Sequence, residues 1–383
     1  MLELSDILNY TGENPDEYYG SVAPPLIMAS NFRFHNVHEF RTAIRNEKDH
    51  LIYSRGNNPT VVMLCKKLAA LEKAEEALVF GSGMAAISTA ILSQVKTGDH
   101  IICQNNAYSW VNTMLTKSIL PRFGVTYTFV DGSNTENVRK AVQANTSLIY
   151  LESPGTMTMG LQDLAEIAAF ARNKGIITIA DNSHATPLFQ NPIALGVDIV
   201  VHSATKYLSG HSDNVAGVLC SSAAIIKKIF HNEFLTLGGI ISPFNAWLML
   251  RSLRTLEVRM ERISASAVKV ADFLVMHPKV EEVIYPMHPS HPQHALAKKQ
   301  MAQGSGLISF LLKTKEVEAI ERFCNALKYF SMAVSWGGYE SLMIPACTFL
   351  DPDTESEIPF NLIRLSIGLE DPAILIADLD RCL

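Results

Sequence analysis

The chain of 383 residues lacks the features that mark membrane and exported proteins. No apolar run approaches the roughly 18 residues that a membrane-spanning helix requires. The first residues carry acidic side chains and no basic segment of the kind that begins a signal peptide. We therefore expect a cytoplasmic protein with no membrane partner.

Metal-binding and disulfide patterns are also missing from the sequence. The six cysteines are scattered without a C-x-x-C pair, and there is no H-E-x-x-H motif. We expect reduced thiols and no metal site. The net charge of −6 gives no reason to expect a nucleic-acid partner. The length allows two domains.

The stretch from Gly175 to Gly217 carries the strongest sign of chemistry. Ile176–Ala180 is an apolar run typical of a buried parallel strand, and Asp181 follows it at once. A second such run, Gly196–Val201, leads into the sequence His-Ser-Ala-Thr-Lys. Ligands of open α/β sheets bind outside the carboxyl ends of the strands, so we expect the acid and the lysine at one site.

Lys206, Asp181 and the hydroxyl groups of Ser203 and Thr205 are the groups that a pyridoxal phosphate (PLP) site requires. A lysine forms a Schiff base with the cofactor, a carboxylate pairs with its ring nitrogen, and hydroxyl groups bind its phosphate. The plainer interpretation is that these residues are ordinary polar ends of two strands. This stretch alone leaves both interpretations open.

A glycine-rich segment, Gly81–Ala86, follows the apolar run Leu78–Phe80 and opens a predicted helix. Its backbone and the N-terminus of the helix suit a phosphate group. The pattern also fits the dinucleotide fingerprint G-x-G-x-x-G/A, which makes a dehydrogenase the rival enzyme class. Against it, no strand-ending acid follows about 20 residues later. A dehydrogenase would also leave Asp181 and Lys206 unexplained.

Five motifs resemble those of the Cys/Met-metabolism (trans-sulfuration) family of PLP-dependent enzymes, and the resemblance extends over nearly the whole chain. They are YSRGNNPT from Tyr53, FGSGMAAI from Phe80, DNSHATP from Asp181, HSATKYLSGHSD from His202 and SWGGYESL from Ser335. The resemblance implies an α/β fold of the aspartate-aminotransferase-like type (fold type I). It has a large domain with a mostly parallel seven-stranded sheet and a small C-terminal α+β domain. The implied parts are an arm over residues 1–50, the large domain over 51–242 and the small domain over 243–383.

The resemblance also implies roles for the residues that match the family's motifs. Lys206 and Tyr108 are the implied catalytic residues, and Ser335 and Arg364 would bind the substrate's α-carboxylate. The implied cofactor-binding residues are Tyr53, Arg55, Gly83, Met84, Tyr108, Asp181, Ser183, Ser203, Thr205 and Lys206.

The arm is expected to reach a neighbouring copy of the chain. In the family, the residues that match Tyr53 and Arg55 bind the cofactor phosphate of the other subunit. This implies a homo-oligomer with shared sites, at least a dimer and usually a tetramer. From the sequence alone, Arg55 would be an ordinary surface residue.

Within the family, the motifs are most similar to bacterial cystathionine β-lyase. Trp336 stands in that form of the SWGGYESL motif, and Val334 replaces a glutamate of many γ-acting members. Trp110 replaces the cysteine of methionine γ-lyases. These residues predict α,β-elimination of L-cystathionine to homocysteine, pyruvate and ammonia. The alternatives are a γ-acting relative (cystathionine γ-lyase, cystathionine γ-synthase or methionine γ-lyase) and a family member without catalytic activity.

Two residues depart from the family pattern. Thr156 replaces an asparagine, and His184 replaces an aromatic residue, so neither receives a role. The hydrophobic spacing further predicts helices over Val61–Ala77 and over the long stretch Pro243–Met276.

Overall fold

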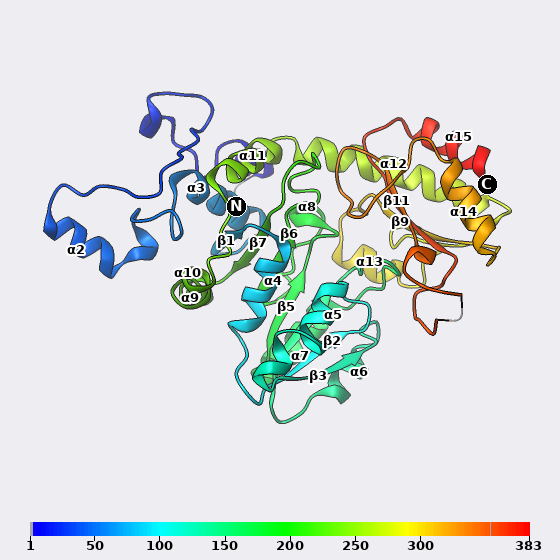
Figure 1. Cartoon of the computed structure of the whole chain (residues 1–383), viewed down its shortest axis with the longest axis horizontal. Coiled ribbons are helices and arrows are strands. Elements are labelled where there is room, and N and C mark those ends of the chain that lie inside the picture. The colour runs from blue at the N-terminus through cyan, green and yellow to red at the C-terminus, as the bar shows by residue number, and fades with distance from the viewer. Residues whose placement is uncertain (1–2, 353) are drawn as a thin grey trace.

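The computed structural model describes residues 3–352 and 354–383, and the chain folds around two sheets (Figure 1). The large sheet has the order β1-β7-β6-β5-β4-β2-β3, and all its neighbours are parallel except the two that flank β7. This confirms the predicted mostly parallel sheet of seven strands. Its strands are β1 (Glu76–Phe80), β2 (His100–Gln104), β3 (Thr126–Val130), β4 (Thr146–Glu152), β5 (Ile177–Asp181), β6 (Ile199–Ser203) and β7 (Gly217–Ser221).

Helices cover both faces of the large sheet. Along β1, Ala77 and Val79 belong to the apolar cluster that contains residues of α3, whereas Leu78 and Phe80 belong to the cluster of α4. Alternate residues of a strand point to opposite faces, so both faces are buried. The helices are α3 (Pro59–Glu72), α4 (Gly83–Leu92), α5 (Ser109–Thr116), α6 (Thr135–Ala141), α7 (Leu164–Lys174), α8 (Thr186–Phe189), α9 (Ala223–Ile229), α10 (Leu235–Leu237) and α11 (Pro243–Leu253), with a 3₁₀ turn η3 (Leu120–Phe123) and a π-helical turn η4 (Phe230–Phe234).

The smaller sheet lies in the C-terminal part, in the order β10-β11-β12-β9-β8. Only β10 and β11 are parallel. The strands are β8 (Val280–Ile284), β9 (Leu307–Leu312), β10 (Ser331–Met332), β11 (Leu342–Pro345) and β12 (Leu362–Ser366); the helices are α12 (Leu256–Met276), α13 (His294–Gln300), α14 (Val317–Ala326) and α15 (Pro372–Cys382), with a 3₁₀ turn η5 (Ala346–Thr348).

Two predicted helices differ from the structure. The helix expected over 61–77 begins with Pro59 after the cap Asn58 and ends at Glu72, because Lys73 adopts a left-handed conformation. Residues 76–80 instead pair with β7. The helix expected over 243–276 is interrupted at residues 254–255, which separate α11 from α12.

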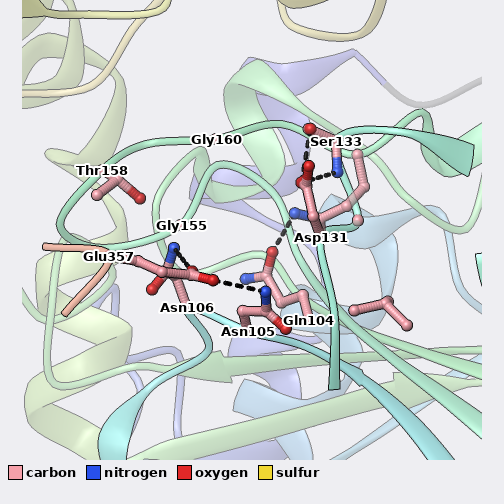
Figure 2. A pocket seen from close by; sticks show the side chains of 12 residues that line it. Gln104, Asn105, Asn106, Asp131, Ser133, Gly155, Thr158, Gly160 and Glu357 are labelled. Atoms are coloured by element: carbon pink, nitrogen blue, oxygen red, sulfur yellow. Dashed lines mark hydrogen bonds between the residues drawn. The ribbon is translucent and has the colours of Figure 1, made fainter. Parts of the chain in front are cut away.

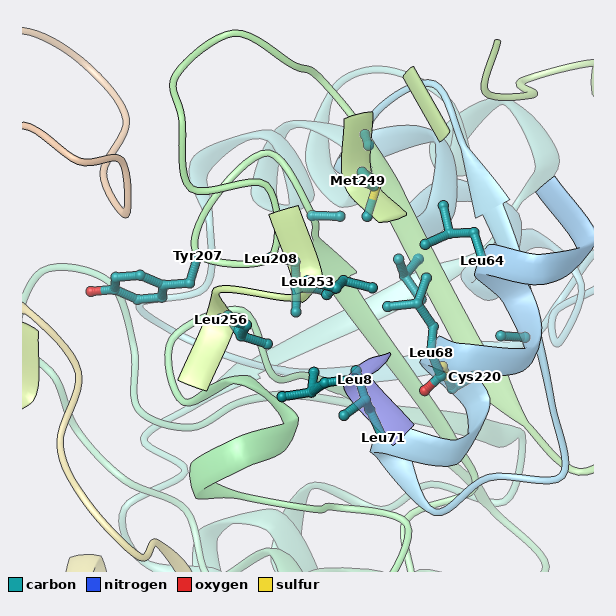
Figure 3. Close-up of a cluster of buried hydrophobic side chains, with 14 of the residues drawn as sticks. Leu8, Leu64, Leu68, Leu71, Tyr207, Leu208, Cys220, Met249, Leu253 and Leu256 are labelled. Atoms are coloured by element: carbon teal, nitrogen blue, oxygen red, sulfur yellow. The ribbon is translucent and has the colours of Figure 1, made fainter. Parts of the chain in front are cut away.

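Helix α11 packs against α3, one of the helices that cover the large sheet. Met249 and Leu253 of α11 share a buried cluster with Leu64 and Leu68 of α3 (Figure 3). The longer α12 extends from there toward the C-terminal part (Figure 1). The boundary expected at residue 243 stays a prediction.

Most of the N-terminal arm projects from the body of the molecule (Figure 1), whereas its first helix packs against α3 with Ile7 and Leu8 buried. It contains α1 (Leu4–Asn9), α2 (Val37–Arg45) and the short 3₁₀ turns η1 (Pro15–Tyr18) and η2 (Glu47–Asp49). Large apolar side chains of the arm are exposed, namely Tyr10, Tyr19, Val22, Leu26, Met28, Val37, Phe40 and Ile44. Its contact with a neighbouring subunit stays a prediction.

Across the described ranges, 3–352 and 354–383, no helix is both long and apolar enough to cross a membrane. Within the same ranges, no group of histidine, cysteine and acidic side chains is arranged to hold a metal ion.

A buried ion pair ties the base of the arm to the large domain. The side chain of Lys67 is fully buried in α3, where its Nζ donates to the carbonyl of Leu8 at 2.7 Å and to Glu13 Oε1 at 3.0 Å. Arg254 Nη2 also donates to Glu13, at 2.8 Å. The carboxylate of Glu13 therefore compensates two cations, one of which has no access to water.

We expect Glu13→Gln to lower the free energy of unfolding by about 3 kcal/mol, because the mutation leaves the charge of Lys67 buried and unpaired. The measurement is urea unfolding followed by circular dichroism. Glu17→Gln, in the exposed part of the arm, is the matched control and should change stability little. Equal stability of the two variants would contradict the importance of this ion pair.

Candidate active site

The site lies where three parallel strands end. The last residues of β4, β5 and β6 are Glu152, Asp181 and Ser203, and Glu152 stands opposite Asp181 in register. Lys206 follows β6 after a short turn. The structure therefore places the acid and the lysine of the sequence prediction at one edge of the sheet, as expected for this class of fold.

Asp181 is held by the serine two residues later. The Asp181 Oδ1 atom accepts hydrogen bonds from the backbone N–H of Ser183 at 2.9 Å and from its hydroxyl at 2.5 Å. The hydroxyl of Ser183 in turn accepts the N–H of Ser203 at 2.6 Å. Burial raises the pKa of Asp181, and the hydrogen bonds from Ser183 oppose that rise.

Lys206 is half-buried beside the turn that carries Ser335 and Trp336. Its Nζ donates to the hydroxyl of Ser335 at 2.5 Å and lies 5.5 Å from the centre of the Trp336 ring. Burial and the charge of Arg364 lower the pKa of Lys206 to about 8, and Asp181 opposes this. A substantial fraction of this amine is therefore neutral, and able to act as a base or nucleophile, near neutral pH.

Ser335 connects the lysine to the buried arginine of β12. Its hydroxyl accepts from Lys206, and its carbonyl accepts from Arg364 Nη2 at 3.0 Å. The backbone of Ser335 has a φ of 82°, a left-handed conformation that costs a non-glycine residue about 1–3 kcal/mol. A Cβ atom on Gly337 would lie 2.8 Å from the backbone nitrogen of Tyr207, so this turn packs directly against the segment of Lys206.

Arg364 is a buried cation without an acidic partner. Only 6% of the residue is exposed. Besides Ser335, its hydrogen-bonding partners are Thr156 Oγ1 at 3.1 Å and the sulfur of Met157. No salt bridge to Arg364 occurs in the part of the chain that the structure describes. Burial lowers the pKa of its guanidinium to about 10, and the group fits a small carboxylate.

The N-terminus of α4 forms an anion cradle beside Ser203. Ser82 caps the helix by accepting the N–H of Ala85 at 3.1 Å. The N–H groups of Gly83 and Met84 have no acceptor among the described residues. A Cβ atom on Gly83 would come within 2.9 Å of the Ser203 side chain, so only glycine allows this approach.

Two further residues that were predicted to bind the cofactor, Thr205 and Tyr108, form hydrogen bonds within the chain. The hydroxyl of Thr205 accepts the N–H of Ala216 at 3.1 Å and donates to its carbonyl at 3.3 Å. Tyr108 precedes α5, its ring is 40% exposed, and its N–H donates to Glu152 Oε2 at 2.8 Å. Burial, followed by the charges of Glu152 and Asp181, raises the pKa of Tyr108.

Tyr53 and Arg55 are not brought to this cluster by their own chain. Both are exposed, and the guanidinium carbon of Arg55 lies 5.6 Å from the centre of the Tyr53 ring. In the described ranges neither side chain has a hydrogen bond or salt bridge to the residues above. Their predicted role requires a second subunit.

A small polar cavity adjoins the site at the end of β2 (Figure 2). The side-chain amides of Asn105 and Asn106 donate to the two carboxylate oxygens of Glu357, at 2.8 and 3.0 Å. Glu357 comes from the C-terminal part of the chain, so these bonds link that part to the loop that leads into Tyr108.

His184 is not a hydrogen-bonded core histidine. It is buried, and its Nδ1 has no partner among the described residues. Burial, and then the charge of Arg364, lowers its pKa to about 3. Its ring centre lies 6.5 Å from that of Trp336, so a neutral imidazole lies near the tryptophan that neighbours Lys206.

Sequence reasoning missed two residues of this site. Thr156, set aside because it departs from the family's asparagine, hydrogen-bonds Arg364. Glu152 receives no role from the sequence motifs. The signal that identified Asp181, an acid directly after a buried apolar run, was also present at Glu152.

Comparisons with known proteins place the chain among relatives of known family. Residues 7–383 match the family described as Cys/Met metabolism PLP-dependent enzyme. An L-methionine gamma-lyase of Fusobacterium nucleatum is 40% identical over 374 residues, covering 95% of this chain and 93% of its own. A cystathionine gamma-lyase of Bacillus subtilis is 37% identical over 383 residues, covering 98% of both.

A solved structure has the same fold. The crystal structure of metB from Corynebacterium glutamicum superposes with a TM-score of 0.93 at 36% identity, covering 100% of this chain and 98% of the other. The predicted fold type I is thereby confirmed.

We expect the amine of Lys206 to react with a small aldehyde at a rate that rises about tenfold per pH unit and levels off above about pH 8, because only the neutral amine is nucleophilic. The measurement is borohydride trapping followed by peptide mapping of the ligand-free protein. A free lysine derivative with an ordinary side-chain amine, added to the same reaction, is the control, with its plateau near pH 10. A plateau for Lys206 at that higher pH would contradict the lowered pKa.

Proposed function

Because the chain belongs to the family of Cys/Met metabolism PLP-dependent enzymes, we propose that it is a carbon–sulfur lyase that cleaves the bond between sulfur and the γ-carbon of an L-amino acid. The observation that supports an amino-acid substrate is the buried guanidinium of Arg364, which has no acidic partner in the described chain. The γ-position follows from the relatives, which are named L-methionine gamma-lyase and cystathionine gamma-lyase.

The donor groups of the site fit pyridoxal phosphate. The free N–H groups of Gly83 and Met84, together with the Ser203 hydroxyl, suit its phosphate. The buried carboxyl group of Asp181 suits its ring nitrogen, and Lys206 suits its aldehyde. When bound, the cofactor supplies a sink for the negative charge that develops on the substrate's α-carbon.

The chain's own residues would bind the substrate and move its protons. Arg364 and the hydroxyl of Ser335 hold the α-carboxylate, which orients the Cα–H bond toward Lys206. The neutral amine of Lys206 removes the α-proton, and γ-elimination also requires the removal of a second proton from Cβ. Burial, and then the charge of Arg364, lowers the pKa of Lys206 to about 8, so a part of the amine can accept a proton near neutral pH. The ring of Tyr108 stacks on the cofactor and assists proton transfer.

Tyr53 and Arg55 complete the site from a second subunit in this proposal. Their exposure and the exposed apolar side chains of the arm support a homodimer or a larger assembly. The molar mass in solution tests it, and a monomer at assay concentrations would exclude shared sites.

A second candidate is β-elimination of L-cystathionine. Trp336 and Val334 support it, since the SWGGYESL form is similar to bacterial cystathionine β-lyase. In the structure Val334 is 83% exposed, and Trp336 packs against Tyr207 with ring centres 5.3 Å apart. Trp110, where methionine γ-lyases have a cysteine, also favours this candidate over methionine as substrate.

The products distinguish the two candidates. With L-methionine or L-cystathionine and the PLP-loaded protein, we expect 2-oxobutyrate and ammonia, together with methanethiol or cysteine respectively. Chromatography of the oxo acids is the measurement. Pyruvate and homocysteine from L-cystathionine would establish β-elimination instead. No oxo acid from either substrate would refute the lyase proposal and point to a synthase or a silent relative.

We expect Arg364→Lys to lower kcat/KM about 10- to 100-fold, chiefly through KM, because an ammonium cannot replace the two-pronged hydrogen bonding of a guanidinium to a carboxylate. Steady-state kinetics measures it. Arg262→Lys is the matched control, since this exposed arginine only donates to the carbonyl of Glu370 at 3.3 Å. Unchanged KM in Arg364→Lys would exclude the carboxylate-binding role.

A further inference from the structure

Glu152 is a buried carboxyl group of the site that the proposed mechanism does not use. It ends β4, directly opposite Asp181 at the end of β5, and each residue is 7% exposed. Residues paired in neighbouring parallel strands point to the same face of the sheet. Two carboxyl groups therefore lie together at the edge where the cofactor is expected.

The backbone of Glu152 is fixed by two glutamines. Its N–H donates to Gln162 Oε1 at 3.1 Å, and its carbonyl accepts from Gln104 Nε2 at 2.9 Å. Both glutamines line the polar cavity of Figure 2, where Gln104 is labelled. This support leaves the carboxyl group of Glu152 free to hold another part of the chain.

That part is the backbone of Tyr108. Glu152 Oε2 accepts its N–H at 2.8 Å, at the point where the loop after β2 turns into α5. No side chain caps this end of the helix. The position of the Tyr108 ring, which is 40% exposed, therefore depends on its backbone anchor more than on packing.

We propose that Glu152 is a positioning residue that anchors Tyr108 against the face of the cofactor ring, beside the ring-nitrogen partner Asp181. The inference rests on the cofactor site of the proposed function. Glu152 acts through Tyr108 and through its charge state.

The two carboxyl groups have different surroundings. Asp181 accepts two hydrogen bonds from Ser183 and lies near the charge of Lys206, whereas Glu152 is held by the backbone N–H groups of Tyr108 and Thr156. Burial, and then the charge of Asp181, raises the pKa of Glu152 to about 8. The protonated form of Glu152 is therefore favoured.

The other titratable groups that face this carboxyl group do not offset its charge. They are Tyr108 before α5, Tyr150 on β4 and Cys103 on β2, and burial, followed by the charges of neighbouring acids, raises the pKa of each. The nearby cation Lys206 acts on Asp181. An ionised Glu152 would therefore be poorly compensated.

This arrangement predicts a pH-dependent stability. The pKa of Glu152 in the folded chain, about 8, exceeds the value of about 4.3 expected in the unfolded chain. The native state binds the proton more tightly, so the contribution of Glu152 to the free energy of unfolding is complete below about pH 4 and is lost as the pH rises through 8. Glu152→Gln cannot lose this contribution. The melting temperature of the variant minus that of the unaltered protein should therefore increase between pH 5 and 9.

The test compares Glu152→Gln and Glu152→Ala with the unaltered protein. The glutamine keeps an oxygen that can accept the N–H of Tyr108, so we expect PLP affinity within about 3-fold and an unchanged circular dichroism band of the bound cofactor. The alanine leaves that N–H without an acceptor, so we expect about 10-fold weaker PLP binding and an altered band. If Glu152→Gln binds PLP normally and Glu152→Ala does not, the hydrogen bond to Tyr108 matters for cofactor binding and the ionisation of Glu152 does not.

Asp378→Ala is the matched control for a purely structural loss. Asp378 is also buried and accepts two backbone N–H groups, those of Lys328 and Tyr329, but it lies in the smaller domain. We expect this variant to be less stable while its cofactor band stays unchanged.

The outcomes separate this inference from the function on which it rests. Failure of the unaltered protein to bind PLP would overturn both. Normal binding and a normal band in Glu152→Ala would overturn the positioning role alone. If Glu152→Ala does not fold, the glutamine variant decides: a melting difference that does not change between pH 5 and 9 would overturn the inference.

Discussion

The hydrogen-bonded path from Lys206 through Ser335 to Arg364 is the constraint on which the site depends. Lys206 follows a strand of the large sheet, whereas Arg364 belongs to the small sheet, and Ser335 bonds to both. The strained backbone of Ser335 is held from both sides. A displacement of the small domain would break the contact of Lys206 with Ser335 and the contact of Arg364 with Thr156 at once, so the proposed substrate binding and proton transfer share one geometric requirement.

The charges of the site are buried without full compensation within the chain. Arg364 has no acid among the described residues, and Lys206 and Glu152 have pKa values shifted toward their neutral forms. Such groups cost folding free energy, which the apolar clusters on both faces of the large sheet must offset. This pattern is expected of an enclosed site built to receive an anionic ligand.

The sequence predicted the features that depend on local pattern. The buried strand that ends in Asp181, the buried strand that leads into Lys206 and the glycine-rich segment that opens α4 all have short-range signals. The break between α11 and α12 and the early end of α3 lacked such signals, because sheet pairing and tertiary packing decide them. Glu152 and Thr156 were missed since their partners, Tyr108 and Arg364, lie far along the chain. The choice between β- and γ-elimination rested on few motif positions, and the relatives now favour the γ-position.

The segment that precedes Ser335 has a consequence for how such an enzyme diversifies. Met332, Ala333 and Val334 are exposed, although the next residue is bound to Lys206. Because their side chains are exposed, substitutions at these three positions change the surface next to the site without removing a hydrogen bond of the lysine, its serine or the arginine. Under the proposed function, selection on that surface and selection on cofactor chemistry act on adjacent but separable positions.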